Sequence, residues 1–229
     1  MYNSLEVSVL NNNKKVPIAV IRRLPRYHRY LSELLKNDIT RISSKELSKV
    51  MGVTASQIRQ DLNFFGGFGQ QGYGYNVEYL YNEFGEILGL SKGRNMIIVG
   101  AGNLGRALAN YSNFVNRGFS LISIFDVNPD IIGKEINGIM VRDFLEVEEF
   151  IKSNYVNIGI LSVPQNQTPN VAEKLAGCGV KALWNFSPMD LKLPYDVVIE
   201  NVHLSDSLMI LSYKLNVLQM KTHQLNADD

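Results

Sequence analysis

The segment "MIIVGAGNLGRAL", which begins at Met96, constrains the fold of this chain more than any other segment. Four apolar residues that predict a buried strand lead into Gly100, Gly102 and Gly105, and a helical pattern follows over residues 104–115. In this strand–turn–helix context, G-x-G-x-x-G is typical of a dinucleotide-binding domain. The first glycine makes the tight turn, the second lets the pyrophosphate approach the backbone, and the third lets the helix pack on the strand.

The next predicted strand, residues 119–126, ends in Asp126, which lies 21 residues after Gly105. An acidic side chain near this spacing accepts hydrogen bonds from the ribose of NAD and repels the 2′-phosphate of NADP. The alternative is that Asp126 only caps the turn before "VNPD". Strands and helices continue to alternate up to residue 201, which predicts a Rossmann-like doubly wound parallel sheet with its ligand at the strand ends. Two further strand ends supply candidate pocket residues, Val163, Pro164, Asn185 and Phe186.

More than ninety residues precede the glycine motif, and they are basic. Residues 14–59 contain eleven lysines and arginines and three acidic residues, a balance of +8. Because the whole chain carries a net charge of +1, the remainder carries −7. This asymmetry predicts two domains, of which the first faces a polyanion; the alternative is a helical domain with solvated basic faces.

Two consecutive helix starts lie within this basic segment. Ser43 and Glu46 form the pattern of a capping box, and Thr54 and Gln57 repeat it after Gly52. The first helix has an apolar face of Leu47, Val50 and Met51. The second has a buried stripe of Ile58, Leu62 and Phe65 and an outward polar stripe of Ser56, Arg59, Gln60 and Asn63. This layout is typical of a DNA-binding helix-turn-helix, although helical hairpins with other partners share it.

The flanking segments complete a winged helix. Residues 64–77, "FFGGFGQQGYGYNV", interleave five glycines with aromatic residues and predict a hairpin wing. An earlier helix, roughly residues 17–36, should kink or restart at Pro25. Asn76 is expected to cap a connecting helix, and residues 89–94 resemble a linker. The predicted domains are therefore a winged helix over residues 1–90, an NAD-binding domain over 95–204, and a C-terminal helix and tail over 205–229.

No catalytic set for hydride transfer is visible in the sequence. There is no Tyr-x-x-x-Lys, and of the three histidines only His203 is placed to approach a cofactor. The single cysteine, Cys178, excludes an intrachain disulfide, and no Cys/His cluster predicts a metal site. We expect a cytoplasmic protein with no signal peptide and no membrane span. The cofactor is then a signal, and the basic domain is the output.

The C-terminal segment predicts an exposed apolar helix. Its leucines, at positions 204, 208, 211, 215 and 218, are spaced four and three apart. Because no element follows that would cover this seam, the neighbouring subunit of a homodimer is the expected partner, with docking back onto the same chain as the alternative.

Together these features resemble the bacterial redox-sensing transcriptional repressors of the Rex family. The resemblance rests on "RRLPRYHRYL", "SSKELSKVMGVTASQIRQDLNFFGGFG", "GYGYNV", "VGAGNLGRALANY", "FDVNPDIIGKEINGI", "LSVP", "NFSP" and "IENVHLSDSL". It implies a homodimer that binds a palindromic operator and that NADH releases from double-stranded DNA, whereas NAD+ permits binding. It also implies that the C-terminal helix is exchanged between the subunits.

Carried over by motif, the resemblance places Arg59, Gln60 and Asn63 on the recognition helix, Asn103, Leu104 and Asp126 at the NAD site, and Arg23 and Tyr111 between the domains. Together with the residues singled out from the patterns above, they give three candidate sets. The cofactor set is Gly100, Ala101, Gly102, Asn103, Leu104, Gly105, Asp126, Val163, Pro164, Asn185 and Phe186. The DNA-binding set is Arg22, Arg26, Ser56, Gln57, Arg59, Gln60, Asn63, Gln70, Gln71 and Tyr73. The residues expected to couple the domains are Arg23, Tyr111 and His203.

The chain departs from the family pattern at two places. Gln70 and Gln71 stand where family wings often carry basic residues, and His203 stands where an acid is common. Asp206 would then replace that acid as the partner of Arg23 and Tyr111. Two rival interpretations remain. One is an enzyme or a module for CoA or another adenine nucleotide, since "KALWNFSP" resembles CoA-ligase domains. The other is a DNA-binding protein whose second domain only dimerises.

Overall fold

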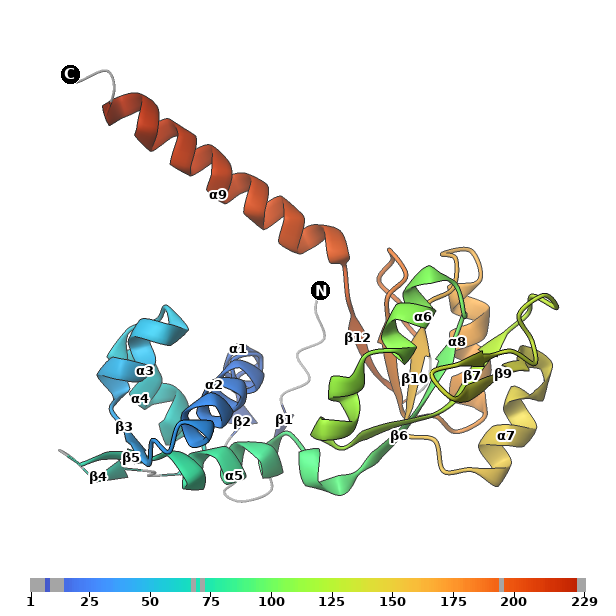
Figure 1. Ribbon diagram of the computed structural model, residues 1–229, viewed down its shortest axis with the longest axis horizontal. Helices are drawn as coiled ribbons and strands as arrows, with labels where there is room; N and C mark the ends of the chain where they lie inside the picture. The colour runs from blue at the N-terminus through green and yellow to red at the C-terminus, as the bar shows by residue number, and fades with distance from the viewer. Residues whose placement is uncertain (1–6, 9–14, 67–68, 71–72, 194–195, 226–229) are drawn as a thin grey trace. The chain divides into compact units, whose positions relative to one another are not determined.

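The computed structural model describes residues 7–8, 15–66, 69–70, 73–193 and 196–225 (Figure 1). The chain divides into two compact units, Met1–Lys92 and Gly93–Asp229. The division falls inside the segment 89–94, where the sequence predicts a linker. A short 3₁₀ helix, Leu90–Lys92, occupies part of that segment.

The described residues of the first unit form a bundle of helices with two small antiparallel sheets. Its helices are α1 (Ile18–Ile21), α2 (Leu24–Lys36), α3 (Ser44–Met51), α4 (Ala55–Asn63) and α5 (Val77–Ile87). Its strands are β1 (Val7–Ser8) paired with β2 (Lys15–Val16), and β3 (Arg41–Ile42), β5 (Gly74–Asn76) and β4 (Gly69–Gln70) in the order β3-β5-β4. The β4–β5 hairpin is the predicted wing, and β3 is an additional strand that the sequence analysis did not predict.

Local hydrogen bonds place the helix starts where the sequence predicts them. Ser43 and Glu46 form a reciprocal capping box, and Gly52 ends α3 in the left-handed conformation, with φ 64°. Thr54 caps α4, and Asn76 caps α5. The second predicted capping box is only half formed, because the Gln57 side chain does not return to Thr54.

Two further details of the helices decide which side chains are buried. The helix is interrupted between α1 and α2, and α2 begins with Pro25 in its first turn, as predicted. The prediction for Val50 was wrong, since this side chain is 42% exposed. The core is instead built from α2, α3, α4 and α5, through residues that include Leu31, Met51, Ile58 and Phe84.

The second unit contains a seven-stranded sheet. The strands are β6 (Arg94–Val99), β7 (Phe119–Asp126), β8 (Glu135–Ile136), β9 (Ile139–Asp143), β10 (Ile158–Leu161), β11 (Ala182–Asn185) and β12 (Val198–Asn201). Their order is β12-β11-β10-β6-β7-β9-β8, and all pairs are parallel except β8–β9. The chain direction across the sheet reverses between β6 and β10, and ligands bind at such a switch point in doubly wound folds.

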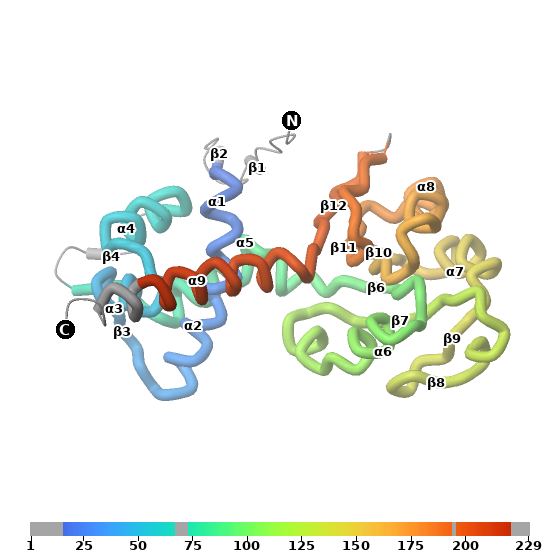
Figure 2. Tube along the Cα trace, turned by 90° about the horizontal axis from the view of Figure 1, so that it is seen from above, coloured from blue at the N-terminus to red at the C-terminus, as the bar shows by residue number. Residues whose placement is uncertain are grey.

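Helices cover both faces of this sheet (Figure 2). Ile97 and Val99 of β6 face a core with α7 (Val147–Ser153) and α8 (Thr168–Gly177). The alternate residues Met96 and Ile98 face a core that includes residues of α6 (Asn103–Ala109). Every second side chain of a strand points to the same face, so one apolar run serves both cores.

The helix predicted over residues 104–115 is shorter than expected. Helix α6 ends at Ala109, and a separate 3₁₀ helix spans Ser112–Arg117. The Asn110 side chain donates to the Arg106 carbonyl over 2.8 Å, as its backbone N–H also does over 3.1 Å. A side chain that shares a helical carbonyl in this way competes with the helical hydrogen bonds and favours a helix end.

The C-terminal helix α9 spans Leu204–Leu225 and begins at the predicted residue. The leucines of its seam, 204, 208, 211, 215 and 218, are 51–66% exposed in the single chain. Leucines at this spacing with so much exposed area are typical of a helix that packs on a partner surface.

Candidate functional site

A cavity of about 540 Å³ lies at the carboxyl ends of the central strands of the second unit. Its walls come from the turn after β6, the end of β7, the turn after β10 and helix α8. The lining residues are Val99, Gly100, Gly102, Asp126, Val127, Phe144, Ser162, Val163, Pro164, Gln167, Asn170, Val171 and Lys174. The position matches the switch point of the sheet, where a dinucleotide is expected.

The three motif glycines meet different surroundings. Gly100 has φ +99°, and a Cβ added there would lie 2.5 Å from the Ser162 carbonyl oxygen. A Cβ at Gly105 would lie 1.9 Å from the Gly100 carbonyl oxygen, so this glycine allows α6 to approach the turn. A Cβ at Gly102 would meet nothing within 4 Å. Gly102 therefore faces open space in the cavity wall, as a glycine that admits a pyrophosphate must.

Asp126 lines the cavity and also organises its wall. One carboxylate oxygen accepts from the backbone N–H of Ala101 over 2.6 Å, and the other accepts from Val127 and Asn128 over 2.8 and 2.9 Å. The alternative interpretation as a turn cap is thus observed, and the side chain nevertheless lies at the cavity. An ionised carboxylate has additional lone pairs for ribose hydroxyls, so the two roles are compatible.

Some of the predicted cofactor residues lie away from this cavity wall. Asn185 is fully buried and hydrogen-bonded at both ends of its amide, to Met189, Asn201 and Ser187. Phe186 packs on Trp184, with ring centroids 4.7 Å apart. Neither side chain lines the cavity, because the strand end they follow is shaped by these loop contacts. Ala101 is buried beneath the turn, and the remaining two, Asn103 and Leu104, start α6.

Sequence reasoning missed the wall that α8 supplies. Gln167, Asn170, Val171 and Lys174 all line the cavity, and their spacing of three, one and three is that of one helix face. This stripe was a signal available in the sequence. Ser162 was missed as well: its hydroxyl donates to the Gly100 carbonyl over 2.8 Å and so braces the glycine turn.

Helix α4 of the first unit presents the predicted polar stripe to solvent. Ser56, Arg59, Gln60 and Asn63 are exposed, while Ile58 and Leu62 are buried against the core. The Arg59 guanidinium donates to the Ser44 hydroxyl over 3.2 Å, which keeps it at the surface. Arginine, glutamine and asparagine on one helix face can hydrogen-bond base edges in a major groove.

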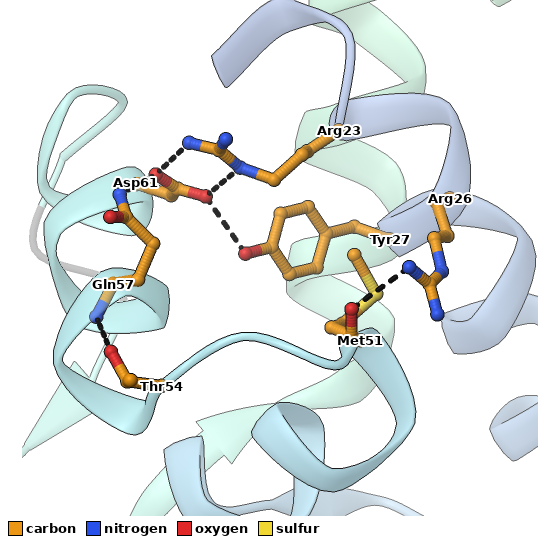
Figure 3. A network of polar contacts seen from close by, with 7 residues as sticks. All are labelled: Arg23, Arg26, Tyr27, Met51, Thr54, Gln57 and Asp61. Carbon is orange, nitrogen blue, oxygen red and sulfur yellow. Dashed lines mark hydrogen bonds and ion pairs between the residues drawn. The ribbon is translucent and has the colours of Figure 1, made fainter. Parts of the chain in front are cut away.

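Two of the predicted DNA contacts form hydrogen bonds within the first unit, although Arg26 is exposed at its surface (Figure 3). The Gln57 amide donates to Asp61 over 2.8 Å. Arg26 donates to the backbone carbonyls of Val50 and Met51 over 2.7 and 2.8 Å. The last carbonyls of α3 lack helical partners and carry partial negative charge, which explains why they attract a guanidinium.

The remaining predicted DNA contacts lie at the surface or outside the description. Arg22 is exposed, and Tyr73 in the wing is 70% exposed. Gln70 belongs to strand β4, and Gln71 lies outside the described residues.

Each residue predicted to couple the domains has partners within its own unit. Arg23 forms a bidentate ion pair with Asp61, at 2.6 and 2.7 Å. Tyr111 is 50% exposed and packs edge-on against Phe114. His203 lies 3.1 Å from the Asp190 carboxylate, and its carbonyl accepts from the backbone N–H of Asp206. An acid therefore does lie beside His203, but it comes from the loop after β11.

A metal site and a membrane-spanning helix each require particular features of the described residues. No group of three or more His, Cys, Asp or Glu side chains there is arranged to hold a metal ion. None of the helices described combines the length and apolar character that crossing a membrane requires.

Comparison with known proteins follows the same two-part division. The family model "Putative DNA-binding protein N-terminus" matches residues 15–63, and the model "CoA binding domain" matches residues 91–189. The redox-sensing transcriptional repressor Rex of Thermoanaerobacter pseudethanolicus is 62% identical over 207 residues, which cover 90% of this chain and 92% of that protein. The Rex of Clostridium perfringens is 54% identical, with 90% and 98% covered.

Solved structures agree with these relatives. RSP in complex with NAD+ and operator DNA is 60% identical with a TM-score of 0.84, covering 92% of this chain and 97% of that one. RSP in complex with NADH is 57% identical with a TM-score of 0.85, covering 92% and 99%. At such identity over nearly the full length, the chain belongs to the Rex family of redox-sensing transcriptional repressors.

Proposed function

We propose that this chain binds NADH and NAD+ in the cavity beside Gly102 and Asp126, and binds a palindromic operator with helix α4, from which NADH releases it. One observation carries the proposal: a single chain combines a cavity at a Rossmann switch point with a helix whose outward face is polar. Its relatives are named repressors, and RSP is seen with NAD+ and operator DNA and with NADH.

The cofactor residues divide the work of holding a dinucleotide. Gly102 leaves the space that the pyrophosphate requires, and Asp126 accepts from the adenosine ribose. The negative charge of Asp126 disfavours a 2′-phosphate, so NADH is preferred over NADPH. When bound, the nicotinamide supplies a redox state that the protein reads without turning it over. Val163 and Pro164 line the same cavity, and we assign them to the nicotinamide end of the cofactor.

The proposed DNA contacts are of two kinds, to base edges and to the DNA backbone. Arg59, Gln60 and Asn63 read base edges, with Ser56 beside them at the start of the helix, and the wing contacts the backbone through the segment that includes Tyr73. Because Arg26 and Gln57 are engaged within the unit, we assign them no base contact.

A palindromic operator calls for two copies of the reading helix. We propose that the chain is a homodimer, in which the exposed leucine seam of α9 packs on the second subunit. We further propose that it works in the cytoplasm, where both DNA and the NADH pool are found.

The proposal is tested by measuring DNA and cofactor binding on the same protein. The DNA probe is a palindromic duplex selected from random-sequence DNA by the wild-type protein, here called the selected duplex. NADH should lower the affinity for it by about 5- to 150-fold, whereas NAD+ should not. By linkage, the selected duplex must lower NADH affinity by the same factor. Equal NADH affinity with and without the duplex would refute redox sensing.

A second ligand class is favoured by the match to a CoA-binding family model over residues 91–189. Titration with NADPH and CoA alongside NADH and NAD+ separates the two cases. Tighter binding of CoA than of either NAD form would replace the dinucleotide by another adenine nucleotide as the signal.

A further inference from the structure

Asp61 stands apart from every other acidic residue that the structure describes, because it is the only one that is buried. It lies in α4, the helix proposed to read DNA, and its exposed side-chain fraction is 1%. A buried carboxylate is costly unless donors surround it, and removing one partner from such a pair is strongly destabilising. A carboxylate this deeply buried must therefore be stabilised by its hydrogen-bond partners.

Four hydrogen bonds converge on the two oxygens of Asp61 (Figure 3). Arg23, at the start of α2, donates through Nε and Nη2 over 2.6 and 2.7 Å. The Tyr27 hydroxyl, also on α2, donates over 2.9 Å, and the Gln57 amide donates over 2.8 Å. Burial alone would raise the pKa of Asp61, but the hydrogen bonds from Arg23, Gln57 and Tyr27 outweigh it and lower the pKa. The Asp61 carboxylate is therefore ionised. We call Asp61 and its three donors, Arg23, Tyr27 and Gln57, the hub.

The hub fixes α4 in a way that apolar packing does not. Ile58 and Leu62 attach α4 to the core through contacts that have little directional preference. A bidentate guanidinium–carboxylate pair is directional, because both donors must lie in line with both oxygens. Asp61 thus sets the rotation of α4 about its own axis, and with it the direction in which Arg59, Gln60 and Asn63 point.

The hub also decides which side chains of α4 remain available to DNA. Gln57 and Asp61 are four residues apart and lie on the same helix face. The amide of Gln57 is drawn toward Asp61, although its place in the first turn of a recognition helix would suit a base contact. Asp61 accordingly removes one potential reader from the DNA surface while it orients the others.

From these contacts we propose that Asp61 is the positioning residue of the DNA-recognition helix: without touching DNA, it clamps α4 to Arg23 and Tyr27 of α2 and withholds Gln57, and so determines operator affinity and specificity. This inference rests on the proposed function, in which α4 reads the operator.

The central test is Asp61→Asn in the full-length protein, a substitution of nearly equal volume that removes the charge and one acceptor. Binding to the selected duplex and to a scrambled duplex is measured at a temperature where circular dichroism shows the variant fully folded. We expect a loss of tenfold or more on the selected duplex, a smaller loss on the scrambled duplex, and unchanged NADH affinity. A role in stability alone would lower the melting temperature and leave the affinity of the folded protein, and the ratio between the duplexes, as in wild type; that result overturns the proposal.

Two further variants keep the test decisive. Tyr27→Phe removes one of the four hydrogen bonds and keeps the ring that packs near Phe84, so it should fold and show a smaller loss of specificity in the same direction. If Asp61→Asn does not fold, Tyr27→Phe with a wild-type ratio between the duplexes overturns the proposal. Gln57→Ala also removes one of the four hydrogen bonds, so its loss on the selected duplex should be no larger than that of Tyr27→Phe; a loss of tenfold or more with Gln57→Ala alone would show that Gln57 contacts DNA and is not withheld.

Arg59→Ala separates failure of this inference from failure of the proposed function. If Arg59→Ala weakens binding and Asp61→Asn does not, only the positioning role is wrong. If neither variant affects the selected duplex, α4 is not the reading helix, and both conclusions fall.

Discussion

Gly102 and Gly105 share one motif, yet the structure predicts opposite consequences when each is replaced by alanine. A Cβ at Gly105 would lie 1.9 Å from the Gly100 carbonyl oxygen and 3.0 Å from the Ser162 hydroxyl. Helix α6 would have to move by about 1 Å or more to restore a normal contact, and overpacking of this kind costs about 1–3 kcal/mol, occasionally more. Because the clash is with backbone, we expect about 3 kcal/mol. For a chain of 229 residues, that lowers the melting temperature by about 6–12 °C.

Gly102→Ala should instead leave the fold intact. Its φ of −69° suits any residue, and the added methyl group meets nothing within 4 Å. The lower preference of alanine for the N-cap, about 0.5–1 kcal/mol, is offset by about 0.4–1 kcal/mol from the reduced freedom of the unfolded chain. The free energy of unfolding should therefore stay within about 1 kcal/mol of wild type. The methyl group nevertheless enters the cavity, so NADH affinity should fall by at least about tenfold, or about 1.4 kcal/mol.

Thermal unfolding of the ligand-free proteins and calorimetric titration with NADH measure the two quantities separately. We expect Gly105→Ala to lower the melting temperature, and Gly102→Ala to lower the NADH affinity while its melting temperature stays close to that of wild type. Wild-type NADH affinity in Gly102→Ala would refute the placement of the pyrophosphate at Gly102. Wild-type stability in Gly105→Ala would refute the argument that this glycine exists to let α6 pack.

Four other predictions address the remaining parts of the molecule. Arg59→Ala should weaken binding to the selected duplex by about 1–3 kcal/mol if it makes a bidentate guanine contact, with NADH affinity unchanged in a parallel titration. Asp126→Ala should lower the affinity for NADH and reduce the ratio of NADH affinity to NADPH affinity; a wild-type ratio in the variant would show that Asp126 is only a turn residue. Deleting residues 204–229 should give monomers by light scattering that do not hold a palindromic site; a truncated protein that remains dimeric and responds to NADH on DNA contradicts the role of α9. Because its pairing lowers the pKa of Asp61 below the ordinary 3.8, the ion pair stabilises the fold above about pH 4 and is lost as the pH falls through the lowered value, so urea unfolding should show wild type and Asp61→Asn converging in strongly acidic buffer.

The sequence by itself determined the elements that short-range hydrogen bonds and periodicity encode. Ser43 with Glu46, Thr54 and Asn76 each begin a helix through a bond that spans three residues, so the pattern in the sequence is the mechanism itself. The glycine motif and Asp126 were equally legible, because Gly100 and Gly105 meet backbone requirements that other residues cannot, and Gly102 and Asp126 stand at the spacing of a dinucleotide site. The alternation of strands and helices likewise predicted a parallel sheet with helices on both faces.

Only the tertiary structure decided where the polar side chains find their partners. Arg26 serves the end of α3, Gln57 turns to Asp61, and Asn185 is enclosed by its own loop, although each was predicted to contact a ligand. These choices join residues up to 25 positions apart, and they depend on which atoms packing brings within 3 Å. A pattern shows which chemical groups a helix or a loop carries. Whether such a group faces a ligand or a neighbour inside the fold depends on which partners packing brings within reach, and for a group that packing buries, as it buries Asn185, desolvation makes such a partner necessary.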